Sequence, residues 1–254
     1  MSNENNAPAL DKIINPERIR KIQSENPFMK LSDIVYDMLE EAILVSAFEA
    51  GTKLNVSRIA ERLDISGTPV STATDRLVKE GFLIENSGKK GKYRTYQVFD
   101  ITNEEMLDLF YARQSLECAT AKACAERHSL VDDGRLRELA AEFSRETKIY
   151  GNNFGMSRVP LIDIEFHKTI AEQSANSFLI KMYDSISPML RYMSVRTSEF
   201  VTPDQNSETF TILSSQHMTI LEGIMSGIPE TASAAMKHHI DYCMKMCMRN
   251  RGKF

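Results

Sequence analysis

The chain contains no tryptophan and only 11 glycines among its 254 residues, and no apolar run approaches the length of about 20 residues that a membrane-spanning helix needs. The N-terminal segment, MSNENNAPALDK, has neither the basic start nor the apolar stretch of a secretion signal. We therefore expect a cytoplasmic protein that does not associate with a membrane. The low glycine content favours a helix-rich fold.

The chain also has few cysteines and a small net charge. The four cysteines lack the C-x-x-C spacing of a zinc knuckle, and they are too few for a disulfide scaffold. The formal net charge is -4 and 26% of the residues are charged, which excludes a polybasic nucleic-acid coat and an acidic disordered tail. Any nucleic-acid-binding surface must therefore be local.

The length of the chain is sufficient for two domains of ordinary size. Residues 1–30 are polar, with three prolines and no sustained apolar period, so we expect a flexible N-terminal arm with at most one short helix near 17–23. From residue 31 the pattern changes, because apolar residues recur at three- and four-residue spacing, as on one face of a helix.

Residues 31–99 predict the elements of a winged helix-turn-helix domain. A first helix ends near Gly51 and a second covers 56–63. A third starts at Thr68, because Thr is a good N-cap and the next residue, a proline, suits the first helical position. A β-hairpin with a basic turn follows, and we interpret it as the wing.

Positive charge is concentrated in this domain. Residues 53–94 hold nine Lys or Arg residues against five acidic residues, in a chain whose net charge is -4. The third helix of a winged helix-turn-helix enters the major groove of DNA, while the wing lies along the backbone. A small helical domain with a solvated basic loop would show the same pattern, because helix-turn-helix geometry also occurs in domains that bind no DNA.

The amino-acid sequence of residues 31–99 identifies a protein family more specifically than the charge pattern does. Its most specific parts are the turn Thr68-Pro69-Val70 and the pair Glu80-Gly81. Further positions of the same string are Ile43, Phe48, Gly51, Leu54, Ile59, Ala60, Leu63, Ile65 and Ser66. Together they resemble the N-terminal domain of the GntR family of bacterial transcriptional regulators. That family has DNA-contacting arginines before the Thr and after the Val, where this chain has Gly67 and Ser71.

Because these two arginines are replaced, the DNA contacts cannot simply be copied from the family. We expect hydroxyl side chains at the start of the third helix to contact base edges or phosphates, and cations of the domain to contact phosphates. The hydroxyl side chains are Ser66, Thr68, Ser71 and Thr72. The cations are Arg58, Arg62, Lys79, Lys89, Lys90, Lys92 and Arg94. The expected partner is double-stranded DNA with a pseudo-palindromic operator, bound by a homodimer.

Residues 101–250 predict a second, all-helical domain. Turn-forming residues separate six expected helices, and about 150 residues suffice for a bundle with its own core. The expected ranges are 103–128, 133–149, 160–174, 177–199, 206–226 and 230–249. The fold class is therefore mainly α, with a small β-hairpin wing in the first domain and an all-α bundle in the second.

Four polar residues lie on apolar faces of these helices. Asp163 and His167 are four residues apart, so they stack on one face. His217 lies in the apolar stripe of the next-to-last helix, and His239, rather than His238, lies in that of the last. The two histidines are ten residues before and ten residues after the Gly-Ile-Pro turn, so an antiparallel helix pair brings them to the same level.

One carboxylate and three imidazoles that converge in an apolar interior form a ligand set for a divalent transition metal, with Zn²⁺ as the first choice and Ni²⁺ or Mn²⁺ as alternatives. A single buried histidine is usually a hydrogen-bonded core residue. Four buried titratable groups together carry a large desolvation cost unless a metal or partners compensate for it. We therefore expect one ion per chain, bound by Asp163, His167, His217 and His239.

The same set resembles the C-terminal effector domain of the FadR-type branch of the GntR family, in which D-x3-H on one helix and histidines from two later helices surround a metal. Asn176 matches an Asn of that pattern, and Arg113-x3-Glu117 resembles its opening helix. The resemblance spans about 101–250 and follows the first domain in the family's order. It implies a regulator that responds to a small carboxylate metabolite.

Arg113 also lies on the apolar face of its helix, where burying a cation costs desolvation free energy unless an anion pairs with it. A metabolite carboxylate is one candidate, and an ion pair with Glu117, one turn later, is the other. We assign effector binding to Arg113, Asn176 and Arg191, although Arg191 also fits a surface cation.

These observations predict a transcriptional regulator, not an enzyme, whose operator binding is controlled by a small organic acid bound near the metal. Two alternatives stay open. A metal-dependent enzyme could use the same His/Asp site, although the pattern places no general base beside the ligands. A ligand-binding module that has lost specific DNA binding would fit Gly67 and Ser71.

Overall fold

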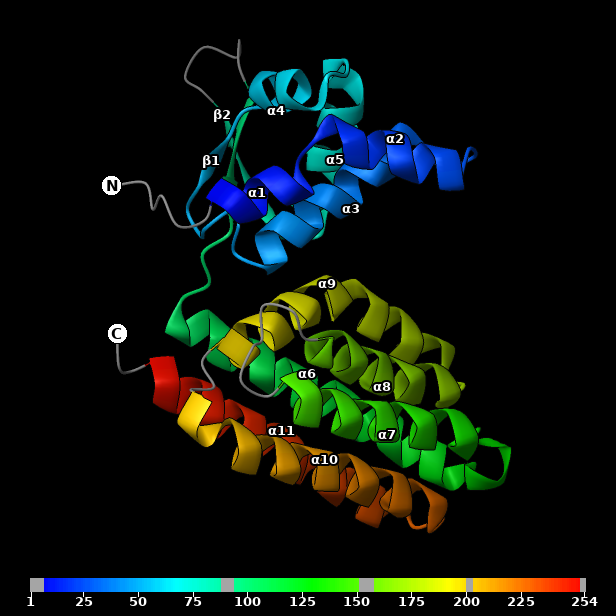
Figure 1. Ribbon diagram of the computed structural model, residues 1–254. Helices are drawn as coiled ribbons and strands as arrows, with labels where there is room; N and C mark the ends of the chain where they lie inside the picture. Colours follow the sequence, from blue (N-terminus) through cyan, green and yellow to red (C-terminus); the bar gives the residue numbers. More distant parts are fainter. Residues whose placement is uncertain (1–6, 88–93, 151–157, 200–202, 252–254) are drawn as a thin grey trace. The chain divides into compact units, whose positions relative to one another are not determined.

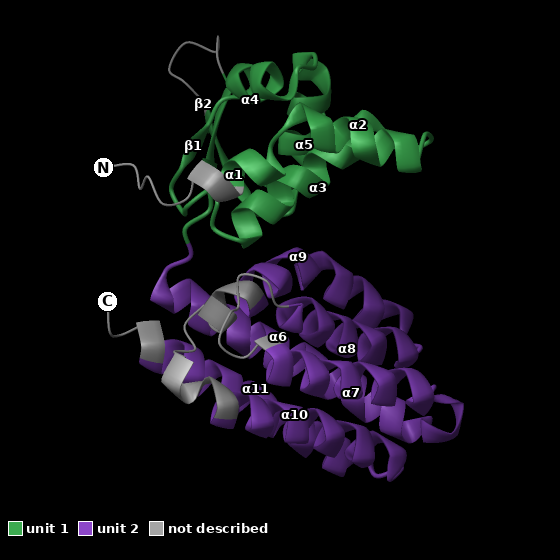
Figure 2. Cartoon of the chain, viewed as in Figure 1, with its two compact units in different colours: residues 1–100 green, residues 101–254 purple. Residues whose placement is uncertain are grey.

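The computed structural model describes residues 7–87, 94–150, 158–199 and 203–251 (Figure 1). The chain divides into two compact units, Met1–Asp100 and Ile101–Phe254 (Figure 2). The first unit combines helices with a small sheet, and every element described in the second is a helix. The predicted fold class is therefore confirmed.

The segment before residue 31 differs from the flexible arm that we predicted. It forms two helices, α1 (Ala7–Ile13) and α2 (Pro16–Glu25). Ile14 and Ile19 are buried, and both helices pack against the first long helix of the unit. The short helix expected near 17–23 is present as α2, whereas α1 and the burial of Ile14 and Ile19 contradict a flexible arm. Pro16 does not break the chain into coil. It occupies the first turn of α2, where a missing backbone N–H costs nothing, and Asn15 caps that helix.

Three further helices and three short strands complete the first unit. They are α3 (Leu31–Leu44), β1 (Lys53–Leu54), α4 (Val56–Leu63), α5 (Gly67–Lys79), β2 (Leu83–Ser87) and β3 (Arg94–Val98). The strands form an antiparallel sheet in the order β1-β3-β2, in which Tyr96 of β3 lies opposite Leu54 on one side and Glu85 on the other. β1 was not predicted, because two residues are too few to show an alternating pattern.

Helices α4 and α5 form the helix-turn-helix (Figure 1). Asp64 ends α4 in the left-handed conformation with a φ of 56°, which turns the chain sharply. α5 begins at Gly67, one residue before the predicted start, with Ser66 at the N-cap position. The apolar face of α5 is buried, since Val70 and Leu77 have no exposed surface. The opposite face of α5 is therefore available to a partner.

The described part of the second unit consists of long helices (Figure 1). They are α6 (Asn103–Glu126), α7 (Asp133–Tyr150), α8 (Val159–Gln173), α9 (Ser177–Glu199), α10 (Pro203–Met225) and α11 (Pro229–Arg251), with a 3-10 turn, η2, at His128–Leu130. Each agrees with a predicted range to within a few residues. Thr102 and Glu105 form a capping box at the start of α6, which explains why that helix begins where it does.

Helix α6 is central to this bundle, because it packs against α8, α9, α10 and α11. Most of its inward residues are apolar, but Arg113 and Glu117 are also buried. Buried polar side chains on α8, α10 and α11 lie in the same interior. Among the described residues, no helix has the combination of length and apolarity required to cross a membrane.

Candidate metal centre

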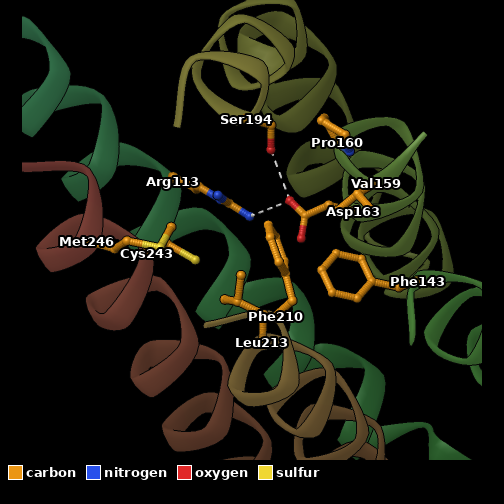
Figure 3. A pocket seen from close by; sticks show the side chains of 10 residues that line it. All are labelled: Arg113, Phe143, Val159, Pro160, Asp163, Ser194, Phe210, Leu213, Cys243 and Met246. Carbon is orange, nitrogen blue, oxygen red and sulfur yellow. Dashed lines mark hydrogen bonds and ion pairs between the residues drawn. The ribbon is translucent and has the colours of Figure 1, made fainter. Parts of the chain in front are cut away.

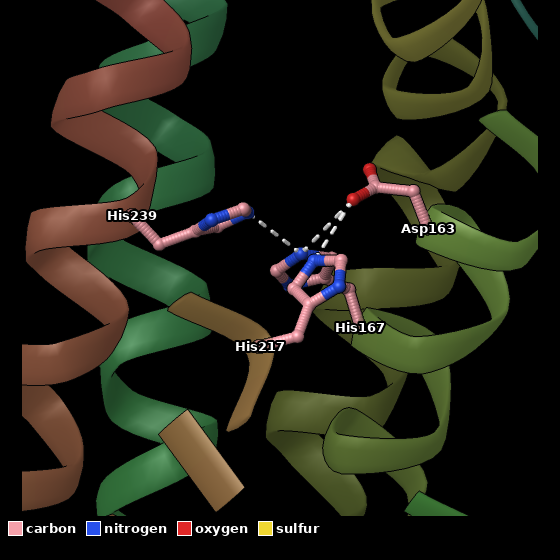
Figure 4. Close-up of side chains that lie close together, drawn as sticks. All are labelled: Asp163, His167, His217 and His239. Carbon is pink, nitrogen blue, oxygen red and sulfur yellow. Dashed lines mark hydrogen bonds and ion pairs between the residues drawn. The ribbon is translucent and has the colours of Figure 1, made fainter. Parts of the chain in front are cut away.

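Four side chains from three helices converge inside the second unit (Figure 4). Asp163 and His167 come from α8, His217 from α10 and His239 from α11, and one potential ligand atom of each lies within 4.8 Å of the others. The one-turn spacing on α8 and the antiparallel pairing of α10 with α11 bring them together, as the sequence indicated.

The distances between these atoms suit a single ion. His217 Nε2 lies 3.1 Å from Asp163 Oδ1, and His167 Nε2 lies 3.7 Å from the same oxygen. His167 Nε2 and His239 Nε2 are 3.2 Å apart. Two ligands bound to one ion at about 2.1 Å lie about 3.0 Å apart at a right angle and about 3.4 Å apart at a tetrahedral angle. The separations of 3.1 and 3.2 Å fall within this range, and the separation of 3.7 Å corresponds to a wider angle of about 125°.

A second layer of polar groups orients the cluster. Glu117 Oε2 lies 2.8 Å from His167 Nδ1, and Gln216 Oε1 accepts a hydrogen bond from His239 Nδ1 at 3.1 Å. Ser194 Oγ donates to Asp163 Oδ2 at 2.9 Å, which leaves Oδ1 directed toward the histidines. Such partners fix the tautomer and the orientation of metal-binding groups.

Sequence reasoning missed these orienting roles. Glu117 was recognised only as a possible partner of Arg113, and Gln216 and Ser194 were not assigned. A polar side chain on a buried helix face beside a candidate ligand could have indicated such a role. Gln216, for example, directly precedes His217.

Burial sets the protonation of the cluster. It lowers the pKa of His217, although the Asp163 carboxylate acts in the opposite direction. Burial and the neighbouring His217 and His167 rings hold the pKa of His239 well below its usual range. Burial alone would raise the pKa of Asp163, but the His217 ring, whose Nε2 lies 3.1 Å from Asp163 Oδ1, the His167 ring and the Arg113 guanidinium hold it well below its usual range. Neutral imidazoles and an ionised carboxylate are the forms that bind metals.

Arg113 lies beside the cluster with 5% of its side chain exposed. Its Nε is 2.9 Å from Glu117 Oε1, and its Nη2 is 3.9 Å from Asp163 Oδ2. Burial opposes its charge, but these two carboxylates outweigh that effect and raise the pKa of Arg113. The ion pair with Glu117, which we considered as the alternative to a metabolite carboxylate, is therefore present. Glu117 is shared between Arg113 and His167.

A cavity of about 40 Å³ adjoins Arg113 and Asp163, and it has room for a few water molecules (Figure 3). Its walls are formed by Arg113, Phe143, Val159, Pro160, Asp163, Ser194, Phe210, Leu213, Cys243 and Met246. Most of this lining is apolar, so the guanidinium and the carboxylate are its main polar features.

Two predicted effector ligands do not line this cavity. Asn176 is exposed, and its Oδ1 accepts hydrogen bonds from the backbone N–H groups of Phe178 and Leu179 at 3.1 and 3.2 Å. It therefore caps α9, which is the common role of Asn at a helix start. Arg191 is half-buried on α9 and contributes nothing to the walls. Of the three predicted residues, Arg113 alone lines the cavity.

The hydroxyl side chains predicted to contact DNA lie at the start of α5. Ser66, Thr68 and Thr72 are exposed, and Ser71 is half-buried. Thr72 Oγ1 donates to the Thr68 backbone carbonyl at 3.1 Å, so its oxygen keeps lone pairs for a partner. The cations Arg58 and Lys79 are also exposed.

The other predicted DNA-binding cations differ in their surroundings. Arg94 forms ion pairs with Glu85 at 2.7 Å and Asp75 at 2.9 Å. Arg62 pairs with Asp11 and donates to the Ile14 carbonyl at 2.9 Å, so it holds α1 in place. Both cations therefore have carboxylate partners inside the domain, and their contact with phosphate stays a prediction. Lys89, Lys90 and Lys92 lie outside the described residues.

Comparison with known proteins identifies both units. The family described as "Bacterial regulatory proteins, gntR family" matches residues 31–90, and the FCD domain matches residues 108–242. The Escherichia coli (strain K12) protein named "Putative L-lactate dehydrogenase operon regulatory protein" is 25% identical over 84% of each chain. The Nta operon transcriptional regulator of Aminobacter aminovorans is 27% identical over 57% of this chain and 64% of its own.

The solved structure of E. coli McbR/YncC covers 88% of this chain and 100% of its own with a TM-score of 0.70, and at 16% identity it supports the fold alone. The FCD match by itself spans more than half of the chain, and members of this family are transcriptional regulators rather than enzymes. The chain thus belongs to the GntR family of bacterial regulatory proteins, as a DNA-binding transcriptional regulator with a C-terminal FCD domain.

Proposed function

We propose that the C-terminal domain binds one divalent transition metal through Asp163, His167, His217 and His239, and that a small organic acid bound beside this metal controls DNA binding. Zn²⁺ is the first choice, with Ni²⁺ or Mn²⁺ as alternatives. The regulator would act as a homodimer on a pseudo-palindromic operator, with one winged helix for each half-site.

The 3.2 Å contact between His167 Nε2 and His239 Nε2 carries the metal proposal. Gln216 Oε1 can only accept, so the adjacent Nδ1 of His239 holds the proton. The Glu117 carboxylate places the proton of His167 on Nδ1 in the same way. Both Nε2 atoms therefore direct lone pairs into one small volume. Such an arrangement is repulsive by itself, and a cation bound between the two nitrogens makes it favourable.

The acid proposal follows from the coordination chemistry and from Arg113. Four protein ligands leave positions in an octahedral shell for an additional oxygen ligand. Arg113 presents a guanidinium to the adjoining cavity, and a guanidinium binds carboxylates through two parallel hydrogen bonds. A carboxylate there would contact both the ion and Arg113, which keeps its ion pair with Glu117.

A second cavity offers space for the body of the acid. It has a volume of about 350 Å³, and Met246 lines it as well as the smaller cavity. Its other walls are Glu208, Thr209, Ile212, Tyr242, Lys245 and Arg249. The E. coli relative is named for an L-lactate dehydrogenase operon, and L-lactate is a small hydroxy acid of the proposed class.

Control of DNA binding requires that the acid bind one arrangement of the protein more tightly than another. The test is the affinity for DNA selected from a random pool, measured with metal-free and Zn²⁺-loaded protein, each with and without a panel of small carboxylates that includes L-lactate. We expect an effective acid to change the affinity only when Zn²⁺ is present. An acid that acts equally on the metal-free protein would contradict the proposal.

A further inference from the structure

Helices α1 and α2 lie before the residues that match the GntR family. They are nevertheless fixed parts of the first unit, because Ile14 and Ile19 are buried and α2 packs against α3 and α4 (Figure 1). Arg18 of α2 forms an ion pair with Glu41 of α3, and Arg62 of α4 donates to the Ile14 carbonyl at 2.9 Å. The side chains of α2 therefore have defined positions beside the helix-turn-helix.

Arg20 of α2 lies at the turn of the helix-turn-helix. Its Nη2 is 3.8 Å from Oδ2 of Asp64, the residue that ends α4 in the left-handed conformation. The two side chains are 67% and 82% exposed, so solvent screens this ion pair and the pair contributes little to stability. Arg20 can therefore exchange Asp64 for another anion at little cost to the fold.

The sequence of this turn and of the start of α5 contains no cation of its own. From Leu63 to Asp75 there is no Lys or Arg, and Asp64 adds a negative charge. The same stretch carries the hydroxyl side chains predicted to contact DNA. A carboxylate repels the phosphates of a duplex, whereas each phosphate that Lys or Arg neutralises adds affinity through the release of counterions. Arg20 is therefore the cation placed to neutralise Asp64 and to meet a phosphate beside the start of α5.

We propose that α2 is part of the DNA-binding surface, and that Arg20 contacts a backbone phosphate beside the bases that the start of α5 reads. Arg20 thereby supplies, from the N-terminal helices, a positive charge that the recognition helix lacks at Gly67. The guanidinium leaves Asp64 for the phosphate when DNA binds. The contact adds affinity without sequence preference, because phosphate contacts position a protein on the duplex and base contacts specify the sequence.

The test is the affinity of the full-length protein for two duplexes of equal length, one selected by the parent from a random pool and one unrelated, each measured at several salt concentrations. Arg20→Gln should weaken binding to both duplexes about fivefold near physiological salt and reduce the salt-dependence slope by about 0.9, the value for one phosphate. Arg20→Lys keeps the charge and should keep the slope of the parent.

Lys21→Gln is the matched control, because it removes the same charge from the next residue of α2. Lys21 lies on the opposite side of the helix from the buried Ile19, and its ion pair is with Glu25 of the same helix. We expect this variant to keep the slope of the parent on both duplexes.

An Asp64→Asn background separates phosphate contact from the neutralisation of Asp64. If Arg20 contacts phosphate, Arg20→Gln lowers the slope by about 0.9 in this background as well. If Arg20 only neutralises Asp64, Arg20→Gln has no effect once the carboxylate is removed, and that result would overturn the proposal. A slope equal to that of the parent in Arg20→Gln, or an equal loss in Lys21→Gln, would overturn it too.

Discussion

Glu117 offers the most informative single substitution, because its two oxygens serve different partners. Oε1 is 2.9 Å from Arg113 Nε, and Oε2 is 2.8 Å from His167 Nδ1. Glu117→Gln keeps the size of the side chain, but an amide has one acceptor oxygen and one donor nitrogen. Whichever way the amide is turned, one of the two partners faces a donor.

The expected losses follow from these contacts. Removing an outer partner of a metal-binding histidine costs about 10- to 100-fold in metal affinity, or about 1.4–2.7 kcal/mol. Breaking a buried ion pair costs about 3–5 kcal/mol of stability, and we expect a value near 3 kcal/mol. The lower value applies because Asp163 Oδ2, at 3.9 Å from Arg113 Nη2, still compensates part of the buried positive charge.

Two assays separate these effects. Competition with a chelator measures zinc affinity, and urea unfolding of the metal-free protein measures stability. Glu126→Gln removes an exposed carboxylate from the same helix and should change neither quantity. If Glu117→Gln matches the parent in both assays, Glu117 neither orients His167 nor holds Arg113, and the reasoning is refuted.

Three other predictions use different parts of the chain. Arg113→Ala should weaken the affinity for an effective acid about 10- to 100-fold, measured by protection from thermal unfolding, without releasing the metal. If the acid protects the variant as well as it protects the parent, the role of Arg113 is structural. The unfolding free energy of the metal-free protein should fall as pH drops below about 6.5. The reason is that burial lowers the pKa values of His217 and His239, so the unfolded chain binds those protons first. Chemical denaturation across this pH range measures the unfolding free energy, and a value that does not change with pH would contradict the prediction. Replacing both Gly67 and Ser71 by Arg should raise the affinity for DNA and change the sequence selected from a random pool, since Arg makes a bidentate contact with guanine. If the selected sequence does not change, these two positions lie away from the bases.

The cluster of Asp163 with three histidines was predictable because it depends on helical periodicity and on one short turn. Asp163 and His167 are one turn apart on any helix, and His217 and His239 are equally distant from the turn that joins α10 to α11. The choice of His239 over His238 also follows from the period, and the structure buries the first and exposes the second.

The features that sequence reasoning missed depend on side-chain placement between elements that are distant along the chain. Arg94 was assigned only to phosphate contact, and its ion pair with Glu85, nine residues earlier, results from the pairing of β3 with β2. Asn176 matched a family position, but its place before α9 makes it a cap. The role of Glu117 toward His167 depends on how α6 meets α8, which no local pattern specifies.

The metal content of the purified protein, determined by elemental analysis after mild zinc loading and removal of free ions, tests the central claim most directly. We predict one ion per chain in the parent and in His238→Ala, whose side chain is exposed, and loss of the ion in His239→Ala. A parent protein without stoichiometric metal, or a His239→Ala variant that retains it as well as His238→Ala does, would contradict the account.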